Sequence, residues 1–137
     1  MARELRFGAG NSGVSGAVRY LIQGGPTQTF GDHDETAMGI LAAGIATEIW
    51  YRASSAHQSG DPDKEPYKLE IVRSRKDGAG IYQEEVIETI EPPSGAAEVL
   101  LVGKSLDFQS LDLLQVREIG FTTVQAQNPT VTLLIKD

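Results

Sequence analysis

The chain has 137 residues, 40% of them apolar, which is enough to form the core of one domain without covalent cross-links. It has no cysteine, which excludes a disulfide framework, a zinc–thiolate site and thiol catalysis. The net charge of −7 argues against nucleic-acid binding through a basic surface, and no apolar stretch approaches the roughly 20 residues of a membrane-spanning helix. We therefore expect neither a nucleic-acid nor a membrane partner.

The first segment combines a few apolar residues with a glycine-rich run. Residues 8 to 16 contain four glycines and two serines, too permissive a composition to hold regular structure unaided. We therefore predict a flexible arm over residues 1–16 and one folded domain over residues 17–137. Leu5 and Phe7 are the apolar residues at the base of this arm, so we predict that they contact a neighbouring subunit.

The next segment mixes short apolar runs with breakers. Val18–Ile22 and Thr27–Phe30 are candidate short strands, each followed by glycine. Thr36–Ala46 has helical spacing but also glycines, and it stays open between helix and strand. Thr47–Arg52 is β-branched and aromatic and is predicted to be a strand. Ser54–Pro66 is rich in serine, proline and acids, which predicts an exposed loop.

The second half carries the clearest strand patterns. Tyr67, Leu69 and Ile71 alternate with charged residues, which is typical of a half-buried strand, and Lys76–Gly80 supplies a turn. Ile81–Glu91 is favoured as the returning strand of a hairpin, although its spacing also fits a helix, and Pro92-Pro93 ends it. Three further apolar runs follow, at Glu98–Val102, Leu113–Phe121 and Thr130–Ile135.

Short strands at this spacing predict a mainly β protein. We expect a single antiparallel β-sandwich or barrel, Ig-like or jelly-roll. At most one substantial helix is expected, in Thr36–Ala46 or Ile81–Glu91.

One stretch matches a cofactor motif in its letters. Gly8, Gly10 and Gly13 form a G-x-G-x-x-G, and Asp32 follows 19 residues after the last glycine. In a dinucleotide fold, however, the preceding strand is buried on both faces and continuously aliphatic, whereas residues 3 to 7 include the charged Arg3, Glu4 and Arg6. We predict that no nicotinamide or flavin cofactor binds here.

Two acidic clusters could supply metal ligands. Asp32, Asp34 and Glu35 surround His33, and Asp61, Asp63 and Glu65 lie in the predicted loop. The first reads better as a helix cap or turn, and the second lacks the glycine and distal glutamate of a calcium loop. We expect no metal site, but the sequence leaves metal binding at both clusters open.

Catalytic side chains are scarce. His33 and His57 are the two histidines, and the serines around His57 have no visible orienting acid, so we expect no catalytic residues and no enzyme activity. The basic cluster of Arg73, Arg75 and Lys76 is interpreted as a solvated hairpin tip.

The glycine- and serine-rich segment 8–16, the absence of cysteine, the acidic charge and the run of short strands ending at Asp137 together resemble small structural proteins of tailed-phage virions, such as capsid decoration or cement proteins and tail or baseplate components. The resemblance implies a homo-oligomer bound to other virion structural proteins, made in the bacterial host cytoplasm and located in the virion. No motif positions match, so no site residues carry over. The alternative is a carbohydrate-binding or adhesion module in which Trp50 and Tyr51 present a stacking face.

Overall fold

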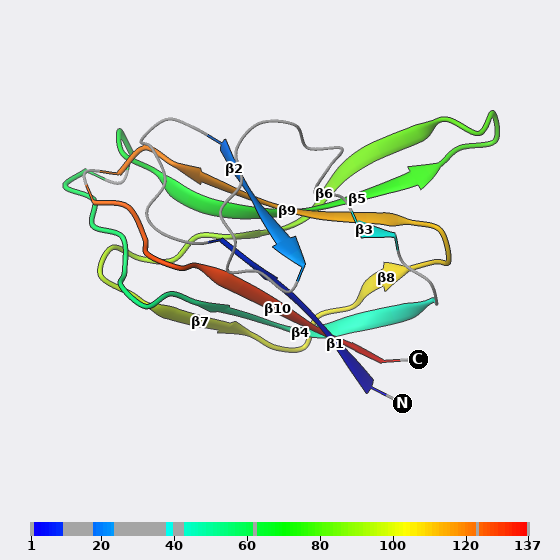
Figure 1. Cartoon of the computed structure of the whole chain (residues 1–137), viewed down its shortest axis with the longest axis horizontal. Helices are drawn as coiled ribbons and strands as arrows, with labels where there is room; N and C mark the ends of the chain where they lie inside the picture. The colour runs from blue at the N-terminus through cyan, green and yellow to red at the C-terminus, as the bar shows by residue number, and fades with distance from the viewer. Residues whose placement is uncertain are drawn as a thin grey trace.

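The computed structural model describes residues 2–9, 18–23, 38–39, 43–61, 63–122 and 124–136, and these residues form ten strands and no helix (Figure 1). The strands are β1 (Ala2–Gly8), β2 (Val18–Gln23), β3 (Met38–Gly39), β4 (Gly44–Arg52), β5 (Tyr67–Lys76), β6 (Tyr82–Ile90), β7 (Glu98–Leu101), β8 (Leu106–Phe108), β9 (Leu113–Gly120) and β10 (Thr130–Lys136). Within this part of the chain, no helix could cross a membrane.

The strands form two antiparallel layers, which Figure 1 shows one above the other. Sheet A has β10 at its centre, with β1 on one side and β4 on the other, and β7 and β8 pair with the outer edge of β4. Sheet B runs from β6 through β5 and β9 to β2, with β3 also paired to β9. The predicted antiparallel β-sandwich is therefore confirmed.

Strand β2 belongs to both layers. Its first four residues pair with β9 in sheet B, and its last two pair with the end of β1 in sheet A. This shared strand makes one side of the sandwich continuous in hydrogen bonding. The opposite side, between β6 and the pair β7 and β8, has no such strand among the described residues, and side-chain ion pairs bridge it instead.

The core lies between the sheets because the strands alternate in burial. On β10, Val131, Leu133 and Ile135 are buried, while the residues between them are partly exposed. The same alternation on β5 buries Tyr67, Leu69 and Ile71, as the sequence predicts. The other large core side chains include Phe7, Leu21, Ile49, Tyr51, Ile90, Phe108, Leu114 and Val116.

The predicted N-terminal arm needs a correction. Residues Ala2–Gly8 form strand β1, which pairs with β10 over its whole length. Leu5 and Phe7 are buried in the core of their own chain, so the structure gives them a packing role rather than the predicted contact with a neighbouring subunit. Residues 10–16, the rest of the predicted arm, lie outside the described residues, as do Thr27–Phe30 and most of Thr36–Ala46.

The remaining strand predictions agree with the structure. Ile81–Glu91 contains strand β6, so the strand interpretation was the right one, and Thr47–Arg52 forms most of β4. The turn between β5 and β6 is organised by Asp77, whose carboxylate accepts hydrogen bonds from the amides of Ala79 and Ile81 at 2.8 and 3.0 Å. These amides hold the pKa of Asp77 below its usual value.

Candidate functional site

A buried ion pair joins β2 to β9 in the interior. Arg19 and Glu118 are directly opposite in the strand register, and both side chains are almost fully buried. The Arg19 guanidinium donates through Nε to Glu118 Oε1 at 2.7 Å and through Nη2 to Oε2 at 3.2 Å. This two-pronged geometry is the one in which a buried pair best offsets the loss of hydration of both charges.

Two tyrosines extend this polar group into the core. The Tyr67 hydroxyl donates a hydrogen bond to Glu118 Oε2, and the ring of Tyr51 lies 6.3 Å from that of Tyr67. Burial, followed by the negative charge of Glu118, raises the pKa of Tyr67 well above its usual value. Burial also raises the pKa of Tyr51 to about 12. Both hydroxyls are therefore protonated at neutral pH; that of Tyr67 donates to Glu118, whereas that of Tyr51 has no hydrogen-bond partner among the described residues.

His57 lies against the ring of Tyr67. Its ring stacks on Tyr67, with centroids 4.4 Å apart and planes inclined at 16°. His57 Nε2 lies 2.7 Å from the carbonyl oxygen of Pro92, and since a carbonyl can only accept, Nε2 carries the proton. His57 Nδ1 is buried and has no hydrogen-bond partner among the described residues. The imidazole thus joins the loop before β5 to the segment after β6.

The predicted exposed loop is correspondingly wrong at His57, which is buried, although most of the segment around it is exposed or partly exposed. The loop is tied to the segment after β6 by two more bonds: the Gly95 amide donates to the His57 carbonyl, and the Ser59 amide donates to Ser94 Oγ, both at 2.9 Å.

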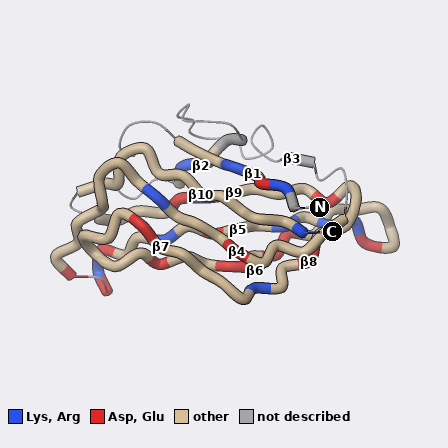
Figure 2. The backbone as a smooth tube through the Cα atoms, turned by 90° about the horizontal axis from the view of Figure 1, so that it is seen from below, with Lys and Arg blue, Asp and Glu red and all other residues tan. Residues whose placement is uncertain are grey.

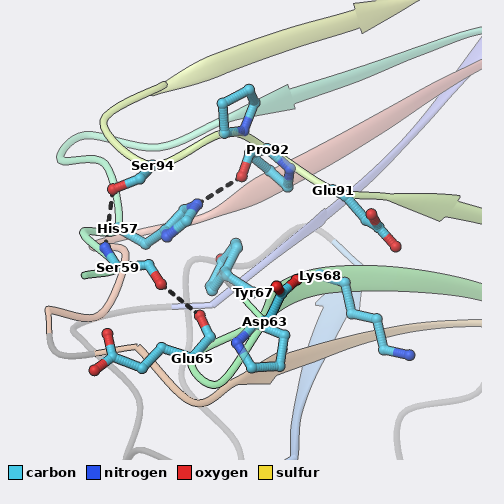
Figure 3. A pocket seen from close by; sticks show the side chains of 11 residues that line it. His57, Ser59, Asp63, Glu65, Tyr67, Lys68, Glu91, Pro92 and Ser94 are labelled. Atoms are coloured by element: carbon cyan, nitrogen blue, oxygen red, sulfur yellow. Dashed lines mark hydrogen bonds between the residues drawn. The ribbon is translucent and has the colours of Figure 1, made fainter. Parts of the chain in front are cut away.

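A surface pocket of about 480 Å³ opens beside His57 and Tyr67 (Figure 3). Its charged residues do not converge on one point: Figure 3 shows the Glu65 carboxylate on one side and the Glu91 carboxylate and the Lys68 ammonium group on the other. Ser59 Oγ donates to the Glu65 carbonyl at 2.7 Å rather than to His57, so these residues do not form a nucleophile and base pair.

The acids of this loop shape its backbone. Asp61 Oδ1 accepts from the Asp63 amide at 3.1 Å, and Glu65 Oε2 accepts from the Gly60 amide at 2.8 Å. Among the described residues, no three histidine or acidic side chains lie close enough to share a metal ion. The other acidic cluster, Asp32 to Glu35 with His33, lies outside the described residues.

The cofactor motif also lies largely outside the described residues. Gly8 is the last residue of β1, an antiparallel strand, whereas a dinucleotide motif follows a parallel strand. Gly10, Gly13 and Asp32 are not among the described residues. That no cofactor binds here stays a prediction.

Arg73 and Arg75 of the basic cluster belong to an ion-pair network rather than to a solvated tip, whereas Lys76 is exposed near the hairpin turn, as the sequence predicts. Arg75 donates to both carboxylate oxygens of the buried Asp112, at 2.9 and 2.7 Å. Arg73 and Arg75 also bind Asp107 on β8, at 3.1 Å each. Burial alone would raise the pKa of Asp112, but the hydrogen bonds from Arg75 and the Gln109 amide together lower it. The network fastens β5 to β8 across the open side of the sandwich.

The outer surface of sheet A carries a different kind of feature. We call it the Trp50 face and define it by the outward side chains of four strands: Glu4 and Arg6 of β1, Thr130, Thr132, Leu134 and Lys136 of β10, Ile45, Glu48, Trp50 and Arg52 of β4, and Glu98 and Leu100 of β7. The register aligns Arg6, Thr132, Trp50 and Leu100 in one row across the sheet. Trp50 is 43% exposed and Leu100 is 52% exposed.

A hollow of about 240 Å³ lies beside the indole on this face, lined by Glu4, Glu48, Trp50, Thr132 and Leu134. Tyr51, the next residue on β4, points to the opposite side and is fully buried. The predicted aromatic pair therefore does not form one surface, and Trp50 is the aromatic residue of this face.

Comparisons with known proteins add little to this description. No protein-family model matches the sequence, and no curated protein matches it. Among solved structures, the chain is similar to one titled "Cryo-EM Atomic Structure of Broad Bean Stain Virus (BBSV)", with a TM-score of 0.40 and 13% identity over 100% of this chain and 86% of that chain. A likeness at this level supports no inference about function, so the functional reasoning rests on the chain itself.

Proposed function

We propose that the chain is a non-enzymatic structural protein of a tailed-phage particle, a capsid decoration protein or a tail component, that acts through protein–protein contacts. The observation that carries the proposal is the Trp50 face. Tryptophan is the residue type most enriched at the energetic centres of protein interfaces, and here it stands exposed in the middle of a four-stranded sheet surface.

The surroundings of Trp50 fit the same role. Leu100 lies directly opposite Trp50 on β7, and Leu134 lies on β10 beside the hollow, so apolar side chains of three neighbouring strands are grouped on the face. Glu4 and Glu48 also line the hollow. Exposed charged residues around them, such as Arg6, Arg52 and Glu98, would form a polar rim. An apolar centre inside a polar rim is the usual anatomy of a protein interface.

The assignment to a phage particle is supported by the composition and fold of the whole chain. A cysteine-free acidic β-sandwich with a glycine- and serine-rich segment at residues 8 to 16 is typical of small virion structural proteins, and the described fold has that architecture. Synthesis in the bacterial cytoplasm and location in the virion belong to the same proposal.

The test is to purify phage particles from the native source on a density gradient and to measure the chain in them by quantitative mass spectrometry. We expect a fixed number of copies per particle. A chain found only in the particle-free fractions would contradict the proposal.

A second candidate, a carbohydrate-binding module, is favoured by one observation. Trp50 borders a hollow that also contains the carboxylates of Glu4 and Glu48, and sugars are commonly held between an aromatic face and polar side chains. Tyr51 cannot take part because it is buried. Binding on a glycan array that is lost in Trp50→Ala would support this function over the first, and an array without signal would exclude it for the glycans tested.

A further inference from the structure

The charges around Trp50 differ from those of the rest of the chain. The Trp50 face carries three acids, Glu4, Glu48 and Glu98, and three bases, Arg6, Arg52 and Lys136, so its formal charge is zero in a protein of net charge −7. Figure 2 shows both signs of charge on the strands of sheet A. The net charge of the chain opposes self-association in general, but a contact of this face with itself would bring no net charge together.

We infer that the occupant of the Trp50 face is the Trp50 face of a second copy, related by a two-fold axis. The inference rests on the proposed function, because it names the first partner of the assembling chain. In a two-fold contact the same patch meets itself, so the patch must supply both members of every complementary pair. A rim with equal numbers of acids and bases meets this condition, whereas a basic partner protein would be better matched by a purely acidic patch.

The shape of the face meets the same condition. It carries both exposed apolar side chains, those of Trp50 and Leu100, and a hollow of about 240 Å³ beside Trp50. Under a two-fold axis, the exposed apolar side chains of one copy can fill the hollow of the other, and the reverse contact is made at the same time. The two sheets would then pack face to face, as the two layers of a sandwich do.

The size of the face sets the strength of the contact. Four strands spaced about 4.8 Å apart, with seven residues along β10 at about 3.3 Å each, give about 400 Å² in projection. Stable interfaces bury about 800 Å² on each partner. We therefore expect a weak, reversible dimer in solution, which many copies on one particle would reinforce through avidity.

The experiment is sedimentation velocity of the full chain over a concentration range of about 10 to 300 µM, where weak dimers are resolved. We expect a monomer–dimer equilibrium. Trp50→Ala should raise the dissociation constant by about tenfold or more, since each substitution acts twice in a two-fold interface. Leu100→Lys tests the same face from β7 and should act in the same direction, with circular dichroism confirming that both variants are folded.

The matched control is Phe121→Ala. Phe121 is 45% exposed, close to the value for Trp50, but it follows β9 of the other sheet. It should leave the equilibrium unchanged. A parent chain that stays monomeric at every concentration, a Trp50→Ala variant that dimerises normally, or an equal effect of Phe121→Ala would each overturn the inference.

The two proposals fail separately. If the chain is monomeric yet present in purified particles, the two-fold contact is wrong and the structural function stands. If the chain dimerises through Trp50 but is absent from particles, the contact stands and the proposed function is wrong.

Discussion

Replacing Arg19 with methionine should be among the most damaging single substitutions in the protein. Arg19 and Glu118 are both almost fully buried, and the guanidinium holds the carboxylate through bonds of 2.7 and 3.2 Å. Methionine fills similar space but leaves the Glu118 carboxylate in the interior without this partner. Breaking a buried pair in this way costs about 3–5 kcal/mol of the free energy of unfolding.

Urea denaturation followed by tryptophan fluorescence measures the cost. With a slope of about 2 kcal/mol per molar urea, the midpoint should fall by about 2 M. The melting temperature should fall by about 12 °C for a chain of this size. The matched control is Arg52→Met, because Arg52 and Glu98 form an exposed pair at 3.6 Å, which contributes less than about 1 kcal/mol.

The double variant Arg19→Met/Glu118→Leu distinguishes the energetic effect of the ion pair from that of the surrounding side-chain packing. Removing both charges leaves no unpaired ion in the core, so the double variant should lose less stability than the two single variants added together. The reasoning is refuted if Arg19→Met costs less than about 1 kcal/mol, or if the two losses simply add.

Three further predictions concern stability. Gly44→Ala should destabilise the fold by about 1–3 kcal/mol in thermal melts, because its Cβ would lie 2.6 Å from Ile135 Cγ2 and 2.9 Å from a backbone oxygen, whereas Gly78→Ala, with open space around it, should be nearly neutral. Asp112→Asn should weaken the fall in the free energy of unfolding at acid pH. The pKa of Asp112 is lowered in the folded state, so the ionised carboxylate stabilises the fold above about pH 3.8, and this stabilisation is lost as the pH falls below that value. An unchanged dependence of stability on acid pH would contradict this prediction. Leu111→Gly should raise the free energy of unfolding by about 0.5 kcal/mol or more, because Leu111 has φ of 73°, a conformation that glycine adopts without strain, and it is 67% exposed; a destabilised variant would count against this account.

Much of the fold is visible in the sequence because the sheets are each covered on one face. That arrangement imposes period-2 alternation, which is plain at Tyr67, Leu69 and Ile71. Strand β6 is harder to predict from the sequence, because its residues up to Val86 are exposed and do not alternate in burial. The N-terminal strand was missed since the glycines after it favoured an arm, although Leu5 and Phe7 already show the alternation of a strand.

The interior of the candidate site was beyond sequence reasoning because it depends on strand register. Arg19 and Glu118 are 99 positions apart, and they meet only because β2 and β9 pair with those two residues opposite each other. The burial of His57 likewise depends on contacts with the segment after β6. The exposed position of Trp50 could have been found, since alternation along β4 must place Trp50 and Tyr51 on opposite faces and the core takes one of them.

The pairing of β1 with β10 has a consequence for how the chain folds. Ala2 lies opposite Lys136 and Gly8 opposite Thr130, so β1 finds its long partner only after all the strands between them have been made. Contacts of such large sequence separation slow folding, and β-sandwiches dominated by them fold in milliseconds to seconds. Sheet A therefore completes late, and until then β1 leaves an unpaired strand edge that a second unfolded chain can occupy.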